Sequence, residues 1–192
     1  MDLSNLPYIY VDNDTKLTEV LSYLSMASVL GIDTETTGLD PLEDKLRLLQ
    51  VADGQHPVAV IDMTIIKVER LKELFKSQAV KVFQNAKFDI KFLLVNGFSI
   101  SGPIFDTMLA AQIVRDNKGP FSFGLGNLAT YYLDTKLPKE EQKSNWGTKL
   151  TKEQIEYAAR DAAILLPLRE RLIKEIKKGN LIEVCKLEFD CV

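Results

Sequence analysis

Residues 31–41 read GIDTETTGLDP, and this stretch places two carboxylates at the end of an apolar run. The residues just before it are mostly apolar and partly β-branched, and Gly38 with Asp40-Pro41 closes it like a turn, which predicts a buried strand. Side chains alternate along a strand, so Asp33 and Glu35 project from the same face. Two like charges about 5 Å apart at an effective dielectric near 20 repel by roughly 3 kcal/mol. A bound cation is the simplest compensation, and a solvated, exposed strand end is the alternative.

The composition predicts one intracellular domain. With 192 residues, 46% of them hydrophobic, the chain can bury one substantial core, so we expect a single domain over 1–192. The formal net charge of -3 excludes a histone-like binder, because a polyanion would have to be held by local Lys and Arg clusters or by metal. Cys185 and Cys191 fit neither a disulfide framework nor a zinc site. Without a basic leader or an apolar run of about 18 residues, we expect a cytoplasmic protein that does not enter a membrane.

Hydrophobic periodicity predicts an α/β fold built on a mixed sheet. The first strand and the apolar runs at 47–52 and 58–62 predict a three-stranded antiparallel meander, with a short edge strand at 8–11. From residue 80 onward strands and helices alternate, which indicates parallel crossover strands with helices on the faces of the sheet. We expect further strands at 80–83 and 104–105 and helices near 17–24, 65–75, 85–96, 107–114 and 121–133.

The last long helix carries a phenol and a carboxylate one turn apart. Thr151-x-x-Gln154 is a capping box that opens this helix, after an aperiodic, lysine-rich stretch at 134–150. Tyr157 and Asp161 are spaced i, i+4 and therefore share one helix face. Pro167 should kink or end the helix, at a cost near 3 kcal/mol. A final helix is expected at 181–192.

Each of the remaining acidic or phenolic groups has an ordinary explanation when it is taken singly. Asp89 could complement the dipole of the helix near 85–96, Asp161 could be an exposed helix charge, and Tyr157 could be a core aromatic residue. Three segments considered together favour a different interpretation. They read DTET at 33–36, QNAKFD at 84–89 and YAARDA at 157–162.

These three segments resemble the exonuclease motifs of the DEDD superfamily, in the variant that carries tyrosine. The resemblance extends from about Ile32 to Leu172, and FDTML at 105–109 is similar to a segment in the proofreading domain of family A DNA polymerases. QKSNWG at 142–147 is also similar to ribonuclease D and the Werner-type exonucleases. The resemblance implies a ribonuclease H-like fold and a 3′-5′ exonuclease that releases nucleoside 5′-monophosphates in proofreading or repair.

By this resemblance, four carboxylates would hold two divalent ions and a phenol would align the attacking water. The metal ligands would be Asp33, Glu35, Asp89 and Asp161, with Asp33 bridging, and Tyr157 would be the phenol. Two ions can generate a nucleophile from water and neutralise the leaving oxygen, and all-oxygen ligands suit Mg²⁺ or Mn²⁺ rather than zinc. The histidine variant would need a histidine shortly before Asp161. The single histidine, His56, lies far from there, and we expect a structural or solvated role for it.

The resemblance also implies contacts with the substrate. Thr36, Gln84 and Asn85 would contact the terminal nucleotide and Leu39 would wedge against its base, although Leu39 could instead pack beneath the Pro41 turn. Phosphates could be bound by basic side chains that could equally be solvated: Lys87, Lys91, Arg160 and the lysines of 134–150. Trp146 could stack on a base, but anchoring of its loop is the favoured role.

We therefore expect a monomeric exonuclease that acts on the 3′ end of single-stranded or frayed nucleic acid, with DNA favoured over RNA. A DNA polymerase could be its partner, in the same chain or as a separate protein. One rival is an RNA 3′-end processing enzyme of the ribonuclease D kind, since contacts to the 2′-hydroxyl decide that choice. The other rival is a non-catalytic nucleic-acid-binding module with the same fold. The presence of all five motif residues counts against this second rival.

Overall fold

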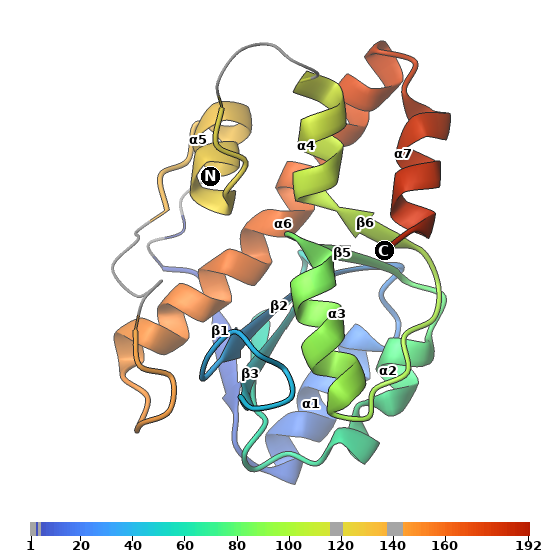
Figure 1. Ribbon diagram of the computed structural model, residues 1–192. Coiled ribbons are helices and arrows are strands. Elements are labelled where there is room, and N and C mark those ends of the chain that lie inside the picture. Colours follow the sequence, from blue (N-terminus) through green and yellow to red (C-terminus); the bar gives the residue numbers. More distant parts are fainter. Residues whose placement is uncertain (1–2, 4, 116–120, 138–143) are drawn as a thin grey trace.

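A six-stranded mixed sheet forms the centre of the molecule (Figure 1). The computed structural model describes residues 3, 5–115, 121–137 and 144–192. The strand order is β1-β4-β3-β2-β5-β6. The strands are β1 (Tyr8–Val11), β2 (Val29–Thr36), β3 (Leu46–Ala52), β4 (Val58–Asp62), β5 (Val80–Phe83) and β6 (Ile104–Asp106). β2, β3 and β4 form the antiparallel meander, β5 pairs in parallel with β2 and β6, and β1 pairs in parallel with β4. The predicted mixed sheet with parallel crossover strands is confirmed.

Helices cover both faces of this sheet. Those described are α1 (Asp14–Leu24), α2 (Lys72–Lys76), α3 (Ala86–Val95), α4 (Thr107–Arg115), α5 (Leu125–Leu133), α6 (Lys152–Lys178) and α7 (Ile182–Asp190). Apolar residues of α1, α2 and α3 pack on one face in a common core. The long helix α6 crosses the other face, and α4 and α5 pack against α6 (Figure 1). None of the described helices has the length and apolar character needed to cross a membrane.

Small residues let α6 lie very close to the sheet. Ala158, Ala159 and Ala162 are completely buried against β3 and β4 side chains. On β2, a Cβ atom added to Gly31 would lie only 2.7 Å from the carbonyl oxygen of Ala162. Glycine at this position is therefore what allows α6 to approach the strand that carries Asp33 and Glu35.

Two predicted helices are shorter in the structure than in the prediction. The stretch 65–75 contains a 3-10 turn (Val68–Arg70) followed by α2, and Ile65 is 53% exposed instead of lying on a buried stripe. The chain turns there because the Asp62 carbonyl accepts hydrogen bonds from the amides of Ile65 and Ile66. The helix predicted over 121–133 begins only at Leu125, after Gly124 in extended conformation as its N-cap.

The prediction for Pro167 was partly wrong, because α6 does not end there. The helix continues for eleven more residues, to Lys178. Leu165, Leu168 and Leu172 are completely buried on both sides of the proline. Burial of this apolar face offsets the loss of one backbone hydrogen bond, since fully burying a leucine side chain contributes about 1.5–3 kcal/mol.

Candidate active site

The carboxylates of Asp33 and Glu35 stand at the C-terminal end of β2, on the face that α6 covers. Both side chains are half-buried. β2 pairs with β3 up to the end of the strand, where the register shifts between Glu35 and Thr36. Such an irregularity ends regular pairing and re-aims the side chains beside it. The predicted strand and the shared face of the two carboxylates are thus present.

Helix α6 contributes Tyr157 and Asp161 to the same region. The capping box is present, since the Thr151 side chain accepts from the Gln154 amide and the Gln154 side chain accepts from the Thr151 amide. One turn later Tyr157 is buried, and its hydroxyl lies close enough to the carboxylate of Asp161 for each group to shift the pKa of the other. The capping box fixes where α6 begins, and it therefore fixes the positions of Tyr157 and Asp161 relative to β2.

Helix α3 contributes the fourth carboxylate. Asp89 lies in the first turn of α3 and is 3% exposed. The Thr34 hydroxyl, from the opposite face of β2 to Asp33, donates a 2.7 Å hydrogen bond to Asp89 Oδ1. The chain reaches α3 through Asn85, whose backbone is left-handed with φ 61°. Thr34 of β2 thus orients the carboxylate of Asp89, although the two residues are 55 positions apart in the sequence.

These four carboxylates repel one another in a region where protein atoms replace part of the surrounding water. Burial raises the pKa of Asp33 well above its usual range, and the charges of Asp89, Glu35 and Asp161 raise it further. Burial together with the charges of Asp161 and Asp89 likewise raises the pKa of Glu35. Groups from three separate segments of the chain therefore influence one another electrostatically, which the sequence spacing alone could not establish.

Asp89 and Asp161 are shifted in the same direction. Burial raises the pKa of Asp89 to about 7, although the hydrogen bond from Thr34 opposes the shift. Burial also raises the pKa of Asp161 to about 7, against the opposing effects of the Tyr157 hydrogen bond and the Arg160 charge. Burial and the nearby Asp161 raise the pKa of Tyr157, so its hydroxyl stays protonated at neutral pH. The carboxyls require a cation if all are to be ionised near neutrality.

The chemistry of the donor set fits a hard divalent cation. All four groups offer carboxylate oxygens, and the half-burial of Asp33, Glu35 and Asp161 leaves access for water and a ligand. Among the described residues, no three acidic, histidine or cysteine side chains stand as ligands around one point. Ligation requires oxygens at about 2.0–2.6 Å from an ion, whereas electrostatic influence acts over longer distances. The carboxylates thus influence one another electrostatically, and their side chains would have to come closer together to bind one ion.

Comparison with known proteins now identifies the family. Residues 8–177 match the model of a family described as 3′-5′ exonuclease. The chain belongs to the 3′-5′ exonuclease family. This exonuclease is 31% identical over 164 residues to DNA polymerase I of Aquifex aeolicus, covering 85% of the chain and 27% of that relative. It is 29% identical over 184 residues to ribonuclease D of Haemophilus influenzae, covering 92% of the chain and 44% of the relative.

A solved structure confirms the fold of the exonuclease. The crystal structure of Escherichia coli RNase D, described as an exoribonuclease involved in structured RNA processing, superposes with a TM-score of 0.84 at 26% identity. The match covers 95% of this chain and 48% of the RNase D chain. The sheet and its helices are therefore ribonuclease H-like, as the motif resemblance implied. The chain spans between about a quarter and a half of the length of these relatives.

Asp106 supports the exonuclease site in a way that the sequence revealed only in part. Its carboxylate accepts hydrogen bonds from the Met108 amide at 2.8 Å, as a helix N-cap does, and from the Ala86 amide at 2.8 Å. It also accepts from the amides of Asn85 and Leu109. Asp106 is 1% exposed and joins the N-termini of α3 and α4. A cap has a local sequence signal, whereas the contact with α3 depends on β5 and β6 being neighbours.

The four residues predicted to contact the substrate differ in their exposure and in their hydrogen bonds. Leu39 is 83% exposed, so the alternative that it packs beneath the Pro41 turn is wrong. Asn85 is also exposed, whereas Thr36 donates to the Gly38 carbonyl. The side chain of Gln84 donates to the Phe123 carbonyl and accepts from the Thr107 hydroxyl. Leu39 and Asn85 are therefore accessible, and the Gln84 amide already has partners on neighbouring elements.

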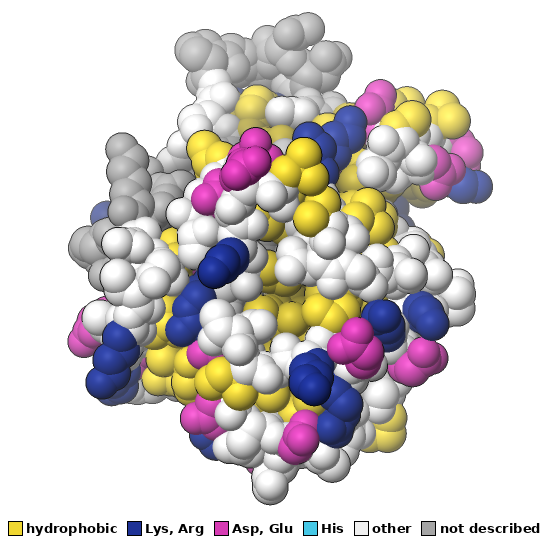
Figure 2. All heavy atoms as spheres, turned by 60° about the horizontal axis from the view of Figure 1, so that its bottom comes forward, with side chains coloured by type: hydrophobic (Ala, Val, Ile, Leu, Met, Phe, Trp, Pro, Cys, Tyr) yellow, Lys and Arg dark blue, Asp and Glu magenta, His cyan; other side chains and the backbone are white. Residues whose placement is uncertain are grey.

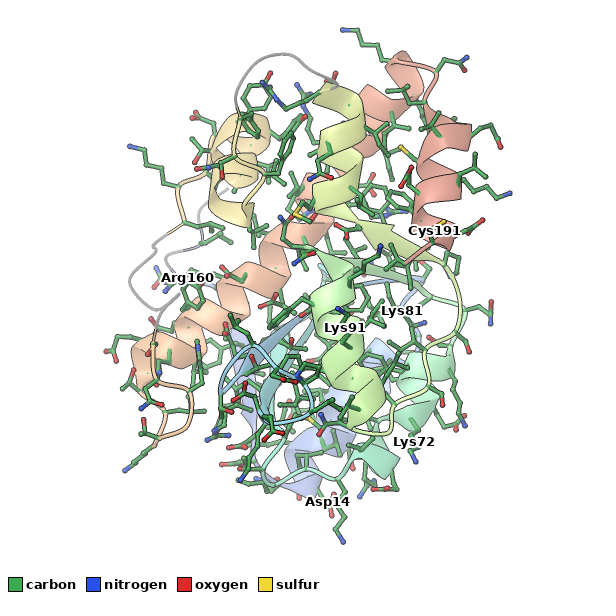
Figure 3. The ribbon with its side chains drawn as sticks, viewed as in Figure 1. Asp14, Lys72, Lys81, Lys91, Arg160 and Cys191 are labelled. Atoms are coloured by element: carbon green, nitrogen blue, oxygen red, sulfur yellow. The ribbon has the colours of Figure 1, made fainter. Side chains whose placement is uncertain are left out.

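The basic residues near the site do not form one cluster. Lys87 and Lys91 are exposed on α3, and Arg160 is half-buried on α6. Figure 3 labels Lys91 and Arg160 on these two helices, which pack on opposite faces of the sheet. On the face shown in Figure 2, Lys and Arg side chains are interspersed with Asp and Glu. Residues 138–143, which include Lys139 and Lys143, lie outside the described residues. Any phosphate contacts from 134–150 remain predictions.

Trp146 and His56 have the structural surroundings that were favoured for them. Trp146 is 5% exposed and packs against Tyr157, with ring centroids 6.4 Å apart. Its burial anchors the loop to the site rather than offering a free stacking surface. His56 lies in the turn before β4, where it contacts Asp53 at 2.7 Å and stacks on Tyr23.

Proposed function

We propose that this exonuclease hydrolyses the terminal phosphodiester of single-stranded or frayed DNA from the 3′ end, releasing nucleoside 5′-monophosphates with the help of two divalent ions. One observation supports the proposal most strongly: four carboxylates from β2, α3 and α6 lie within electrostatic reach of one another and resist ionisation. Exonucleases of this fold depend on divalent metal. Unpaired carboxylates that have raised pKa values are what such an ion would stabilise in ionised form.

Each residue of the site has a role in this proposal. Asp33, Glu35, Asp89 and Asp161 would hold Mg²⁺ or Mn²⁺, with Asp33 between the two ions. Bound ions supply a metal-activated water and neutralise charge on the leaving oxygen. The raised pKa of Tyr157 keeps its hydroxyl protonated beside Asp161, and its oxygen would accept a hydrogen bond from the attacking water. Thr34 holds the carboxylate of Asp89 in place.

The exposed Leu39 supports a role in gripping a terminal base. A leucine that is 83% exposed at the rim costs solvation free energy unless it contacts an apolar surface such as the face of a base. Base contacts of this kind are tolerant of sequence. Leu39→Ala should therefore raise KM several-fold on all oligonucleotides, with a smaller effect on kcat.

The second candidate function is 3′-end processing of RNA. It is favoured by the similarity to ribonuclease D, which extends over as much of the chain as the similarity to DNA polymerase I. Matched DNA and RNA strands of one sequence, labelled at the 5′ end, would separate the two candidates. A kcat/KM at least about tenfold higher on DNA supports our proposal, whereas the reverse ratio supports RNA processing.

The decisive experiment is digestion of a 5′-labelled single strand with Mg²⁺, with Mn²⁺ and with EDTA. We expect a ladder of products that shorten one nucleotide at a time with either metal, and intact substrate in EDTA. Asp33→Ala and Asp161→Ala should abolish the ladder while circular dichroism shows a folded protein. Tight binding of the strand without any metal-dependent release of nucleotides would favour the non-catalytic alternative instead.

Sedimentation of the same preparation would test the accompanying expectations. We propose that residues 1–192 act as one exonuclease domain and as a monomer. A polymerase, joined in the same chain or bound as a separate protein, would supply the frayed ends. A dimer in sedimentation, or a stable fragment released by limited proteolysis, would contradict these expectations.

A further inference from the structure

Gln50 is a buried amide that lacks partners in the middle of β3. Its side chain is 0% exposed. Neither Nε2 nor Oε1 has a hydrogen-bond partner among the residues that the structure describes. Leaving a buried amide donor or acceptor unpaired destabilises the folded state, because the group has lost its hydrogen bonds with water. The side chain therefore needs a polar group that can approach it within the covered face of the sheet.

The pairing of the strands places Gln50 directly beside Asp33. β2 and β3 are antiparallel, with Asp33 opposite Gln50. On the other side, Gln50 lies opposite Val60 of β4. Residues that are directly opposite in an antiparallel pair project from the same face, with Cβ atoms about 4.5–5.5 Å apart. Gln50 and Asp33 thus share the face that α6 covers, and Val60 offers no polar atom.

The neighbours of Gln50 along its own strand are apolar. Its neighbours two positions away on β3, Leu48 and Ala52, belong to a buried cluster that includes Ala158 and Ala162 of α6. Among these side chains and the two register partners, only Asp33 can form a hydrogen bond with an amide.

We propose that Gln50 is a positioning residue that donates a hydrogen bond from Nε2 to the carboxylate of Asp33 when the divalent ions are held. This inference rests on the proposed function, in which Asp33 lies between two ions. A neutral amide can fix the orientation of an ionised carboxylate without adding charge to the site and without titrating. Groups that orient a metal ligand in this manner typically change metal affinity or activity by about 10–100-fold when they are removed.

The test compares Gln50→Met with the wild type in Mn²⁺ titrations followed by thermal unfolding. Methionine keeps an unbranched side chain of similar length and removes both amide groups. Without metal, Gln50→Met should be as stable as the wild type or more stable, because no unpaired polar group is buried. The Mn²⁺ concentration that gives half of the stabilisation should rise by about 10–100-fold. Nuclease activity should fall at low Mn²⁺ and recover at high Mn²⁺.

Two further variants make the result specific. Gln55→Met applies the same chemical change at an exposed position in the turn between β3 and β4, and it should leave Mn²⁺ binding and activity unchanged. Gln50→Leu serves as the second variant if Gln50→Met does not fold, with the same expected rise in the Mn²⁺ requirement. Wild-type Mn²⁺ affinity in a folded Gln50 variant would overturn the positioning role. Loss of activity without any change in the Mn²⁺ dependence would also overturn it.

The failure of this inference can be distinguished from the failure of the proposed function. If the wild type binds Mn²⁺ and shortens DNA or RNA but the Gln50 variants match it, only the role of Gln50 is wrong. If the wild type neither gains stability from Mn²⁺ nor releases nucleotides, the proposed function is wrong, and the role of Gln50 fails with it.

Discussion

The Thr34 hydroxyl donates a 2.7 Å hydrogen bond to Asp89 Oδ1, and both side chains are buried. The contact joins β2, which carries Asp33 and Glu35, to α3, which carries Asp89. In Thr34→Val the shape is retained but the donor is lost, so Asp89 would be buried with one partner fewer. We expect a loss of about 1–3 kcal/mol in the free energy of unfolding near neutral pH, measured by urea denaturation.

The same substitution should change the pH dependence of activity. The hydrogen bond from Thr34 lowers the pKa of Asp89, so its removal should raise that pKa further above about 7. The acid limb of the kcat/KM profile should then move to higher pH. Thr18→Val is the matched control, because Thr18 is exposed on α1 and its hydroxyl bonds only the Asp14 carbonyl. An unshifted acid limb in Thr34→Val would show that Asp89 is not among the titrating groups.

Substituting an acid of the site should separate stability from activity. In Asp161→Asn the repulsion that Asp161 exerts on Asp33 and Glu35 is removed. Without metal we therefore expect the melting temperature to rise at pH 8, where the wild-type carboxyls are most ionised. Nucleotide release should fall by more than about 100-fold. Removing a residue that only orients a metal ligand lowers activity by about 10–100-fold, and Asp161 would be a ligand itself.

Asp190→Asn provides the control for this prediction. Asp190 is an acid at the end of α7, in a region where α7 packs on α6 and β6 rather than on the site. The Asp190→Asn substitution should leave both the melting temperature and the activity within error of the wild type. An Asp161→Asn protein that is less stable than the wild type at pH 8 would indicate that the acids are not under mutual repulsion.

Stability without metal should fall as the pH rises from about 4 to about 7. In the folded state the pKa of Asp89 and of Asp161 is about 7, compared with an ordinary value of 3.8. In this window the unfolded chain releases protons that the folded chain retains, and stability therefore decreases with pH. Carboxyls with lowered pKa values, such as Asp62, titrate below this window.

Divalent metal should reverse this trend, because the ion competes with protons for the same oxygens. The gap between melting temperatures in MgCl₂ and in EDTA should widen from pH 5 to pH 8. Thermal unfolding at intervals of half a pH unit would measure it. A gap that is constant with pH would mean that Mg²⁺ binds to groups other than these carboxyls.

The sequence allowed most of the fold and the five motif residues to be proposed, and the reasons are local. Alternation and periodicity located β2, and the Thr151 capping box located the start of α6. Contacts that depend on the order of the strands in the sheet could not be predicted from these local sequence patterns. Asp106 caps α4 by a local rule, but its contact with α3 requires β6 to lie beside β5. Likewise, the pairing of Gln50 with Asp33 depends on the register of two strands.

The errors also have physical causes. The apolar residues at 65–75 have helical spacing, yet hydrogen bonds at Asp62 turn the chain before a helix can form. Pro167 is unfavourable in isolation, and tertiary burial along α6 outweighs that local cost. Local propensity is a weak predictor wherever a segment is covered by the core.

Pro167→Ala should stabilise the protein without changing its activity. Alanine restores an amide donor inside α6 and has a helix propensity about 3 kcal/mol more favourable than proline, of which we expect about 1 kcal/mol or more to appear as stability. The catalytic turn lies six residues upstream, so kcat/KM should be unchanged. Glu170→Ala, at an exposed position of α6, controls for general gains in helix propensity. A loss of stability would mean that the helix is adapted to the proline ring.

Gly31→Ala should damage the site by separating α6 from β2. The added Cβ would lie 2.7 Å from the Ala162 carbonyl oxygen, a backbone atom that can move only if α6 moves. Overpacking of this kind typically costs about 1–3 kcal/mol. Because Asp161 directly precedes Ala162, the shift should also lower kcat by more than the loss of folded protein explains. Gly124→Ala is the control, since its added Cβ would meet only the Ser122 hydroxyl at 3.9 Å. Wild-type activity in folded Gly31→Ala would show that the site tolerates displacement of α6, contrary to the close approach that the structure displays.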